Sequence, residues 1–260
     1  MNNYYDENID IGVGLNQVDN LKPSSYFYQI IQQHSDYEQL ENKLQSYYDN
    51  AKTEINLRER ECDIVSVRIA ELLNETAFVF SPVSLLSIHK KLFSGVFDGK
   101  LKNCVGVFRD FNISKKENII DNHSVTYADK DNITAYLDYD FERELNKDYS
   151  KLTANEQIKN ISQFIANIWQ IHPFAEGNTR TIALFSIKYL NKKGFIVDNS
   201  LFKEYSQYFR NALVLANYAD IKSGIVENRS YLESFLIRLL IDPKHTLKEL
   251  NNPYQKAVKQ

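Results

Sequence analysis

The sequence HPFAEGNTR, which begins at His172, places a histidine, a carboxylate, a glycine and an arginine within nine positions. The chain holds only eight glycines and five histidines in 260 residues, so this stretch gathers side-chain types that are scarce elsewhere. An unperturbed imidazole titrates at about pH 6.5, and His172 is therefore suited to accept a proton at neutral pH. Glu176 offers carboxylate oxygens to a Mg²⁺ ion that substrate phosphates would hold jointly.

The centre of the same stretch predicts a site for an anion. A helix that begins after Gly177 presents backbone N–H groups without intrahelical partners and a partial positive charge. Gly177 lets the chain approach a ligand closely, and Asn178 tolerates the left-handed conformation of a tight nest of N–H groups. Arg180 can donate to phosphate oxygens in a bidentate manner. With His172 and Glu176, these residues indicate nucleotidyl or phosphoryl transfer.

Two helices have to position this loop, one on each side. Thr153 and Glu156 have the spacing of a capping box, which predicts the start of a helix with an apolar stripe. That helix runs directly into His172. A second helix follows the loop and ends at the basic residues before Gly194. The loop is thus predicted to be a helix–loop–helix joint.

Helical patterns dominate the rest of the chain, and we predict an all-α domain. Residues 104–128 differ, because two short β-prone runs flank turn-forming residues and predict a small hairpin or flap. Residues 1–24 are polar and lack periodicity, which predicts a loosely ordered arm. Further helices are predicted within residues 26–50, 81–95, 133–145, 201–217 and 230–241.

Composition and charge exclude several classes of protein. Hydrophobic residues make up 43% and charged residues 25% of the chain, as in an ordinary globular protein. A net charge of −3 gives no basic field for nucleic acid, and no apolar run approaches the roughly 18 residues of a membrane span. Cys62 and Cys104 support neither a disulfide framework nor a zinc site. We expect a cytoplasmic protein that binds neither nucleic acid nor a membrane.

The motif HPFAEGNTR resembles the signature of the Fic family, HxFx(D/E)GNxR. The stretches FSPVSLLSIHKKLFSG, FRDFNIS, DYDFERE and YFRNALVLANY also resemble Fic segments, so the resemblance covers about residues 60–245. It implies an all-α, Fic-type helical bundle with a small β-hairpin flap over the active site. It also implies three regions: an N-terminal arm with accessory helices (1–55), a Fic catalytic domain (56–245) and a polar C-terminal tail (246–260).

The resemblance implies transfer of AMP from ATP to a Ser, Thr or Tyr hydroxyl of a target protein, with release of pyrophosphate. ATP would be the substrate and Mg²⁺ the cofactor. A segment of the target would pair with the flap, about residues 112–127, and self-modification is a further option. The implied roles are general base for His172, core packing for Phe174, Mg²⁺ ligand for Glu176, phosphate or nucleotide binding for Gly177, Asn178, Thr179 and Arg180, and adenine contact for Asn217.

Two positions of the motif depart from the family pattern. Many active members read GNGRxxR, whereas this chain has Thr179 at the third position and Ala183 at the second arginine position. Without that arginine the γ-phosphate is held less firmly, while Mg²⁺ and Arg180 still handle the charge on the other phosphates. Two alternatives therefore stay open, a catalytically weak Fic-like module for binding or regulation, and transfer of another phosphate-bearing group.

The inhibitory helix of the family, (S/T)xxxE(G/N), is incomplete before the core. Ser66 is present, but Ala70 stands at the glutamate position and Glu71 is displaced by one residue, about 100° around a helix. Because Ala70 and Ala183 both lack charge, we predict a protein without the usual Glu-mediated autoinhibition. A literal match, SGIVEN at residues 223–228, lies between two expected core helices and is the alternative regulatory segment.

Overall fold

The computed structural model of the chain describes residues 6–33, 36–51 and 55–257. Within these ranges the chain forms helices that are joined by loops and short 3₁₀ turns. The α-helices are α1 (Glu7–Asn16), α2 (Ser25–Ile30), α3 (Tyr37–Asp49), α4 (Leu57–Asn74), α5 (Pro82–Phe93), α6 (Ile133–Leu145), α7 (Ala154–Ile171), α8 (Asn178–Lys192), α9 (Ser200–Asn217), α10 (Ser230–Leu240) and α11 (Pro253–Ala257). The 3₁₀ helices are η1 (Gln17–Asp19), η2 (Gly99–Cys104), η3 (Asn118–Ile120), η4 (Lys130–Asn132), η5 (Tyr149–Lys151) and η6 (Ile221–Ser223).

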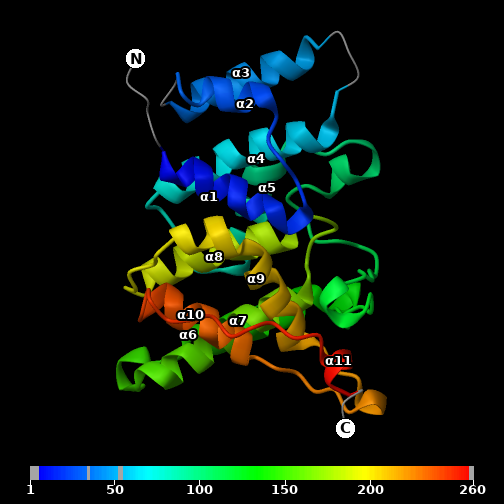
Figure 1. Cartoon of the computed structure of the whole chain (residues 1–260), viewed down its shortest axis with the longest axis vertical. Helices are drawn as coiled ribbons and strands as arrows, with labels where there is room; N and C mark the ends of the chain where they lie inside the picture. The colour runs from blue at the N-terminus through cyan, green and yellow to red at the C-terminus, as the bar shows by residue number, and fades with distance from the viewer. Residues whose placement is uncertain (1–5, 34–35, 52–54, 258–260) are drawn as a thin grey trace.

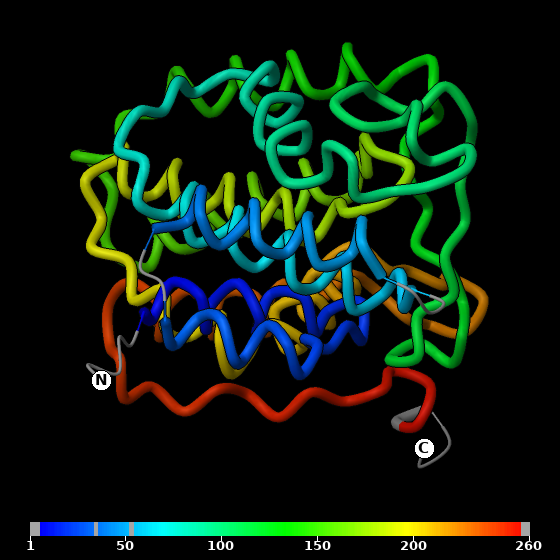
Figure 2. Tube along the Cα trace, turned by 90° about the horizontal axis from the view of Figure 1, so that it is seen from above, coloured from blue at the N-terminus to red at the C-terminus, as the bar shows by residue number. Residues whose placement is uncertain are grey.

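The helices stack in successive layers (Figure 1). α2 and α3 lie at one end, α6, α7 and α10 lie toward the other, and α8 and α9 cross the middle. The C-terminal segment after α10 runs along one side of the molecule and ends in α11 (Figure 2). Every residue of α8 from Asn178 to Leu190 is buried, so the helix that follows the motif loop forms the centre of the fold.

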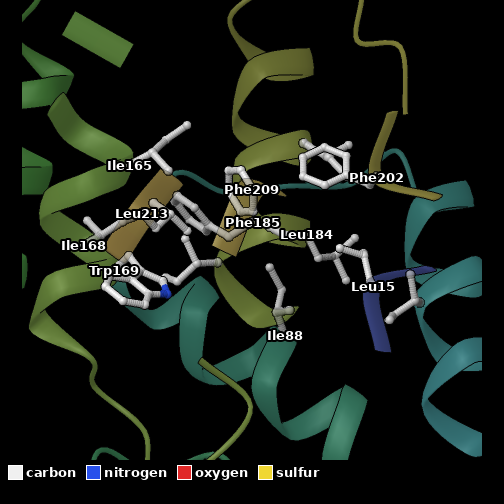
Figure 3. Close-up of a cluster of buried hydrophobic side chains, with 14 of the residues drawn as sticks. Leu15, Ile88, Ile165, Ile168, Trp169, Leu184, Phe185, Phe202, Phe209 and Leu213 are labelled. Carbon is white, nitrogen blue, oxygen red and sulfur yellow. The ribbon is translucent and has the colours of Figure 1, made fainter. Parts of the chain in front are cut away.

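The hydrophobic core around α8 is rich in aromatic side chains (Figure 3). Trp169 of α7, Phe185 of α8 and Phe209 of α9 are all buried, and burying one phenylalanine stabilises the folded state by about 1.5–3 kcal/mol. α7 begins at the predicted capping box, in which Thr153 and Glu156 bond each other's backbone N–H, so this prediction is confirmed. The core therefore fixes both helices that carry the loop.

The N-terminal region is more ordered than its sequence predicts. The expectation of a loosely ordered arm is wrong for residues 7–19, which form α1 and η1. α1 packs against α4 and α9, and its glycines allow a very close approach, since a Cβ atom on Gly12 would lie 2.4 Å from the Ser66 carbonyl oxygen. The helix escaped prediction because it is buried on more than one face and so has no single apolar stripe.

The β-hairpin predicted within residues 104–128 is not confirmed. The described parts of the chain contain no strand, and in this segment a single isolated antiparallel bridge joins Glu117 to His123. One reason is that a side chain replaces a backbone partner, because the N–H of Lys115 donates to a serine hydroxyl oxygen at 3.1 Å. The chain still folds back on itself here, and residues 112–127 are called the flap below.

The other helical predictions are confirmed. α2 and α3 match the helices predicted within residues 26–50, with α2 beginning one residue earlier, and α6, α9 and α10 match their predicted ranges to within one residue. α5 begins at Pro82 and is followed by Gly95 with φ 69°. Buried side chains of α1, α2 and α3 join the same core as those of the later helices, and the boundaries near residues 55 and 245 stay predictions. No helix in the described ranges is long and apolar enough to cross a lipid bilayer.

Candidate active site

The motif loop joins α7 to α8 through two residues with left-handed backbone conformation. His172 is the C-cap of α7 with φ 50°, and its N–H donates to the Trp169 carbonyl oxygen at 3.0 Å. Gly177 is the N-cap of α8 with φ 74°. A Cβ atom at this position would lie 2.4 Å from the ring of Phe93. The glycine is therefore required by both conformation and space.

Two polar side chains after Gly177 hold the shape of the loop. The Asn178 carboxamide accepts from the Phe174 N–H at 2.9 Å and donates to the Phe174 carbonyl oxygen at 2.7 Å. The Thr179 hydroxyl oxygen accepts from the indole N–H of Trp169 at 3.1 Å. Both side chains are buried, so contacts of Asn178 and Thr179 with a nucleotide would rest on their backbone N–H groups.

The N-terminus of α8 has the features of an anion site. The ladder of the helix starts with the N–H of Thr181, which donates to the Gly177 carbonyl oxygen at 3.0 Å. The N–H groups of residues 178–180 precede it, and helix geometry gives them no intrahelical acceptor. Their positive partial charge favours an anion at the start of the helix.

Glu176 lies at the edge of the loop, and 34% of its side chain is exposed. Its carboxylate accepts from the Gly177 N–H at 3.0 Å and faces the ammonium group of Lys115 in the flap, 3.2 Å from both oxygens. In the described ranges, no three His, Cys, Asp or Glu side chains gather in a way that could hold a metal ion. A divalent cation at Glu176 would thus take its other ligands from substrate phosphates and water.

The imidazole of His172 is buried, with 2% of the residue exposed, and the ring of Tyr127 covers it at a centroid distance of 4.2 Å. Nδ1 lies 3.3 Å from the Trp169 carbonyl oxygen, which assigns the proton to Nδ1 and leaves a lone pair on Nε2. Nε2 is buried and has no hydrogen-bond partner among the described residues. Burial, followed by the charge of Lys115, holds the pKa of His172 well below its ordinary value. A neutral imidazole with an unused lone pair is the form that a general base requires.

Arg109 ties the end of α7 to both ends of the flap. Its guanidinium donates to the carbonyl oxygens of Ile171 at 3.2 Å and His172 at 2.8 Å. It also donates to those of Phe111 at 2.7 Å and Ala128 at 2.6 Å. A buried cation at the C-terminus of a helix interacts favourably with the helix dipole. Arg109 lies in the stretch FRDFNIS, whose sequence alone indicates no role for it.

His89 of α5 supports the other end of the loop, at Glu176. Its Nδ1 accepts from the Gly106 N–H at 2.9 Å, so Nε2 carries the proton and donates to the Glu176 carbonyl oxygen at 3.0 Å. The ring stacks on Phe174 at a centroid distance of 3.9 Å. Burial lowers the pKa of His89 to about 4. His89, which belongs to no motif of the sequence, thus positions the backbone of Glu176.

Arg180 is fully buried and is bound by acidic and amide groups of the chain itself. It donates from Nη2 to Glu61 at 2.6 Å and from Nη1 to Asn16 at 2.8 Å. Its Nε lies 3.0 Å from a carboxylate oxygen of Asp19, and its guanidinium covers the ring of Phe93 at 4.7 Å. These contacts do not support the implied contact between Arg180 and phosphate, because Arg180 has no exposed atom to offer.

Arg210 of α9 continues this network toward the flap. It lies 3.1 Å from Asp19, which therefore bridges two arginines, and it donates to Glu117 of the flap at 2.9 Å. A cavity of about 480 Å³ opens beside Arg210, between η1, the flap and α9. Sequence reasoning did not identify Asp19, Glu61 or Arg210, since no local spacing marks residues that meet only in the folded chain.

The amide N–H groups of Asn217 are used within the chain. Its carboxamide is buried at the end of α9 and donates to the carbonyl oxygens of Ala166 at 3.1 Å and Leu213 at 2.9 Å. These bonds tie α9 to α7 and to itself. The adenine contact that the resemblance implies for Asn217 stays a prediction.

The candidate regulatory residues lie on α4 and at η6. Ser66 is buried and accepts from Asn16 of α1, whereas Glu71 is exposed on α4. Ala70 and Ala183 are both buried in the core. The SGIVEN segment lies at η6 and the loop after it, and its glutamate is exposed. A regulatory role for any of these residues stays a prediction.

Comparison with known proteins supports the fold and the motif. Residues 79–190 match the model of the Fic/DOC family. The structure is similar to the crystal structure of the N-terminal Fic domain of a Bartonella effector protein (Bep), a substrate of the VirB T4SS, from Bartonella sp. AR 15-3. The TM-score is 0.51 at 20% sequence identity, and the match covers 83% of this chain and 88% of that chain. No curated protein shows significant similarity to the sequence.

At this identity the likeness to the Bartonella domain concerns the fold, and it confirms the predicted all-α, Fic-type helical arrangement. The family match adds the motif itself, because it includes α7, the loop and nearly all of α8. The loop from His172 to Arg180 therefore lies in the part of the chain, residues 79–190, that matches the Fic/DOC family.

Proposed function

We propose that this chain is a Fic-type protein adenylyltransferase, which transfers AMP from ATP to a Ser, Thr or Tyr hydroxyl of a protein and releases pyrophosphate. One observation carries the proposal: Nε2 of His172, which has no partner among the residues that the structure describes, the carboxylate of Glu176 and the N-terminus of α8 meet on one loop. A base, a cation ligand and an anion site are what such a transfer requires. The match to the Fic/DOC family supports the same class of reaction.

In the proposed reaction, the target hydroxyl oxygen forms a bond to the α-phosphorus of ATP, and the bond from that phosphorus to the pyrophosphate oxygen breaks. The hydroxyl proton passes to Nε2 of His172, because Nδ1 already donates to the Trp169 carbonyl oxygen. The N–H groups that follow Gly177 stabilise the negative charge on the phosphate oxygens. Arg109 and His89 act through the backbone, which they hold in place at both ends of the loop.

The donor set fits a Mg²⁺ ion that the protein shares with the nucleotide. Glu176 supplies a partly exposed carboxylate that already faces a positive group, the ammonium of Lys115. When bound, Mg²⁺ would neutralise charge on the phosphates of ATP. The cavity beside Arg210 offers room for part of a nucleotide.

A second candidate, a Fic-like binding or regulatory module with little catalysis, is favoured by a specific observation. Tyr127 covers His172, and Asp19 and Glu61 enclose Arg180. A target hydroxyl reaches Nε2 of His172 only after the flap moves. The adenylyltransferase proposal includes two kinds of target. One is a segment of another protein of a reducing cytoplasm, which would pair with the flap. The other is a hydroxyl group of this chain itself.

The experiment is a labelling assay with ATP and Mg²⁺, carried out with the protein alone and with a cell extract. ATP labelled at the α-phosphate should label a protein, whereas ATP labelled at the γ-phosphate should not, which separates AMP transfer from phosphate transfer. His172→Ala should lower the transfer by about 10²–10⁴-fold. Equal labelling by the wild type and His172→Ala would refute the base assignment, and nucleotide binding without transfer would favour the binding module.

A further inference from the structure

The inner face of the flap carries two charged side chains that are two residues apart. Side chains of an extended segment alternate between its faces. Ile113, Lys115 and Glu117 are partly or fully buried, whereas Ser114 and Lys116 between them are exposed. Lys115 and Glu117 therefore point from the flap toward the loop and α9.

Each of these two side chains has an ionic partner across the site. Glu117 accepts from Arg210 of α9 at 2.9 Å. The ammonium group of Lys115 lies 3.2 Å from both carboxylate oxygens of Glu176, with 22% of the Lys115 side chain and 34% of the Glu176 side chain exposed. Two ion pairs thus connect the flap to the elements beneath it.

The pair with Lys115 uses the same oxygens that a divalent cation would need. One oxygen of Glu176 also accepts from the Gly177 N–H at 3.0 Å, so both oxygens already have partners. The flap segment that carries Lys115 continues to Tyr127, whose ring covers His172. The charge of Lys115 also acts on His172, since it adds to burial in lowering the pKa of that imidazole.

We propose that Lys115 is a positioning residue that occupies Glu176 in competition with the divalent cation. Its ammonium group keeps the flap closed over His172 while the metal site is empty, and cation loading at Glu176 releases Lys115 and the flap. The inference rests on the proposed function in one respect, namely that Glu176 binds the cation of a Mg–nucleotide complex.

An alternative role for Lys115 makes the opposite prediction. A lysine that contacts the phosphates of the nucleotide would help to hold the Mg–nucleotide complex, and its removal would weaken binding. A lysine that competes for Glu176 opposes the cation, and its removal strengthens binding. The sign of the change in affinity therefore decides between the two roles.

The experiment measures Mn²⁺ binding in the presence of saturating ADP, which cannot donate AMP with release of pyrophosphate. Free Mn²⁺ is followed by electron paramagnetic resonance in the 260-residue wild type, Lys115→Gln, Lys159→Gln and Glu176→Gln. Lys115→Gln should bind Mn²⁺ about two- to fivefold more tightly than the wild type, as expected from loss of a partly exposed ion pair. Lys159→Gln, which removes an exposed lysine of α7 away from the cavity beside Arg210, controls for net charge and should match the wild type.

Hydrogen exchange over residues 112–127 gives the second measurement. Mn²⁺ and ADP should raise the exchange of the flap in the wild type, and Lys115→Gln should show the raised exchange without the cation. Unchanged or weaker Mn²⁺ binding by Lys115→Gln, with binding lost in Glu176→Gln, would overturn the competition and leave the proposed function standing. Unchanged binding in Glu176→Gln would instead remove Glu176 as the metal ligand, and the proposed function would fail on that point.

Discussion

The motif loop has two sides that differ in how their polar groups are used. On the side toward the core, the side chains of Asn178, Thr179 and Arg180 are all bonded within the chain. On the side toward the flap, Nε2 of His172 has no partner in the described part of the chain, and Glu176 keeps a third of its side chain exposed. One side holds the loop, and the other would bind a ligand once the flap moves.

This contrast shows that one short motif contains both side chains that hold the loop in place and side chains that would act in the reaction. Buried polar groups normally have partners, because leaving one unpaired costs free energy. On the core side, Asn178 and Thr179 obey this rule, and Arg180 is held by ion pairs although its Nε makes no hydrogen bond in the described part of the chain. The exception at His172 lies where a substrate hydroxyl would supply the missing partner. Substitutions on the core side should therefore mainly lower the free energy of unfolding. Substitutions on the flap side should mainly lower the rate of AMP transfer.

The largest effect on stability is expected for Arg180→Met. The substitution keeps much of the side-chain volume but leaves Glu61 without its buried cation and Asp19 with Arg210 alone. Breaking a buried ion pair costs about 3–5 kcal/mol, and since both carboxylates keep some exposure we expect a loss of about 3 kcal/mol. Urea unfolding measures it, with Arg143→Met as the matched surface control, which should change stability by less than about 0.5 kcal/mol. Equal stability of the two variants would contradict a holding role for Arg180.

A smaller loss is expected for Gly177→Ala. Its φ of 74° costs an L-residue about 1–2 kcal/mol, and the new Cβ would meet the ring of Phe93 at 2.4 Å. Gly194 is the matched control, because its φ is 89° and nothing lies within 4 Å of its Cβ position. We expect about 2–3 kcal/mol for Gly177→Ala and about 1 kcal/mol for Gly194→Ala in urea unfolding. If both lose the same amount, the contact with Phe93 is not what selects glycine in the loop.

The next effect is a pH dependence that His89 contributes. The pKa of His89 is about 4 in the folded chain, whereas an unfolded histidine titrates at about 6.5. Between these values the unfolded state binds the additional proton, so the free energy of unfolding falls as the pH drops below 6.5. Between pH 7 and pH 5 this site accounts for a loss of about 2 kcal/mol.

His89→Gln should therefore reduce the difference in unfolding free energy between pH 7 and pH 5 by about 2 kcal/mol. The glutamine variant also loses the ring that stacks on Phe174, so its absolute stability is not the informative quantity. The slope with pH is informative, because only a titrating group changes it. The same slope in both proteins would mean that His89 does not stay neutral beneath the Glu176 carbonyl group.

Sequence predicted the parts of the site that depend on neighbouring residues. The capping box at Thr153 and the glycine at residue 177 act within a few positions, so spacing alone locates the two helices and the loop. The resemblance to the Fic family then supplied roles for His172 and Glu176. The helical patterns of the sequence predicted the all-α fold class. In the structure, α8 and its neighbours form one aromatic-rich core.

Sequence did not predict the contacts that bring distant segments together. Asp19 and Arg180 belong to η1 and α8, and no pattern in either segment indicates that they meet. The same holds for Lys115, because the flap forms no strand ladder from which its register could have been derived. The alternation of buried and exposed residues from Ile113 to Glu117 is the one local signal that could have placed Lys115 on the inner face.

The smallest effect on stability is expected at Thr179, the motif position at which many active Fic members have glycine. Thr179→Val keeps the shape of the side chain but removes the acceptor of the Trp169 indole N–H, which leaves a buried donor unpaired. We expect a loss of about 1 kcal/mol in urea unfolding, against less than about 0.5 kcal/mol for the exposed Thr134→Val. Transfer of AMP should be retained, because the backbone N–H of residue 179 is unchanged. If Thr179→Val unfolds like the wild type but no longer transfers AMP, Thr179 acts in the reaction and not in holding the loop.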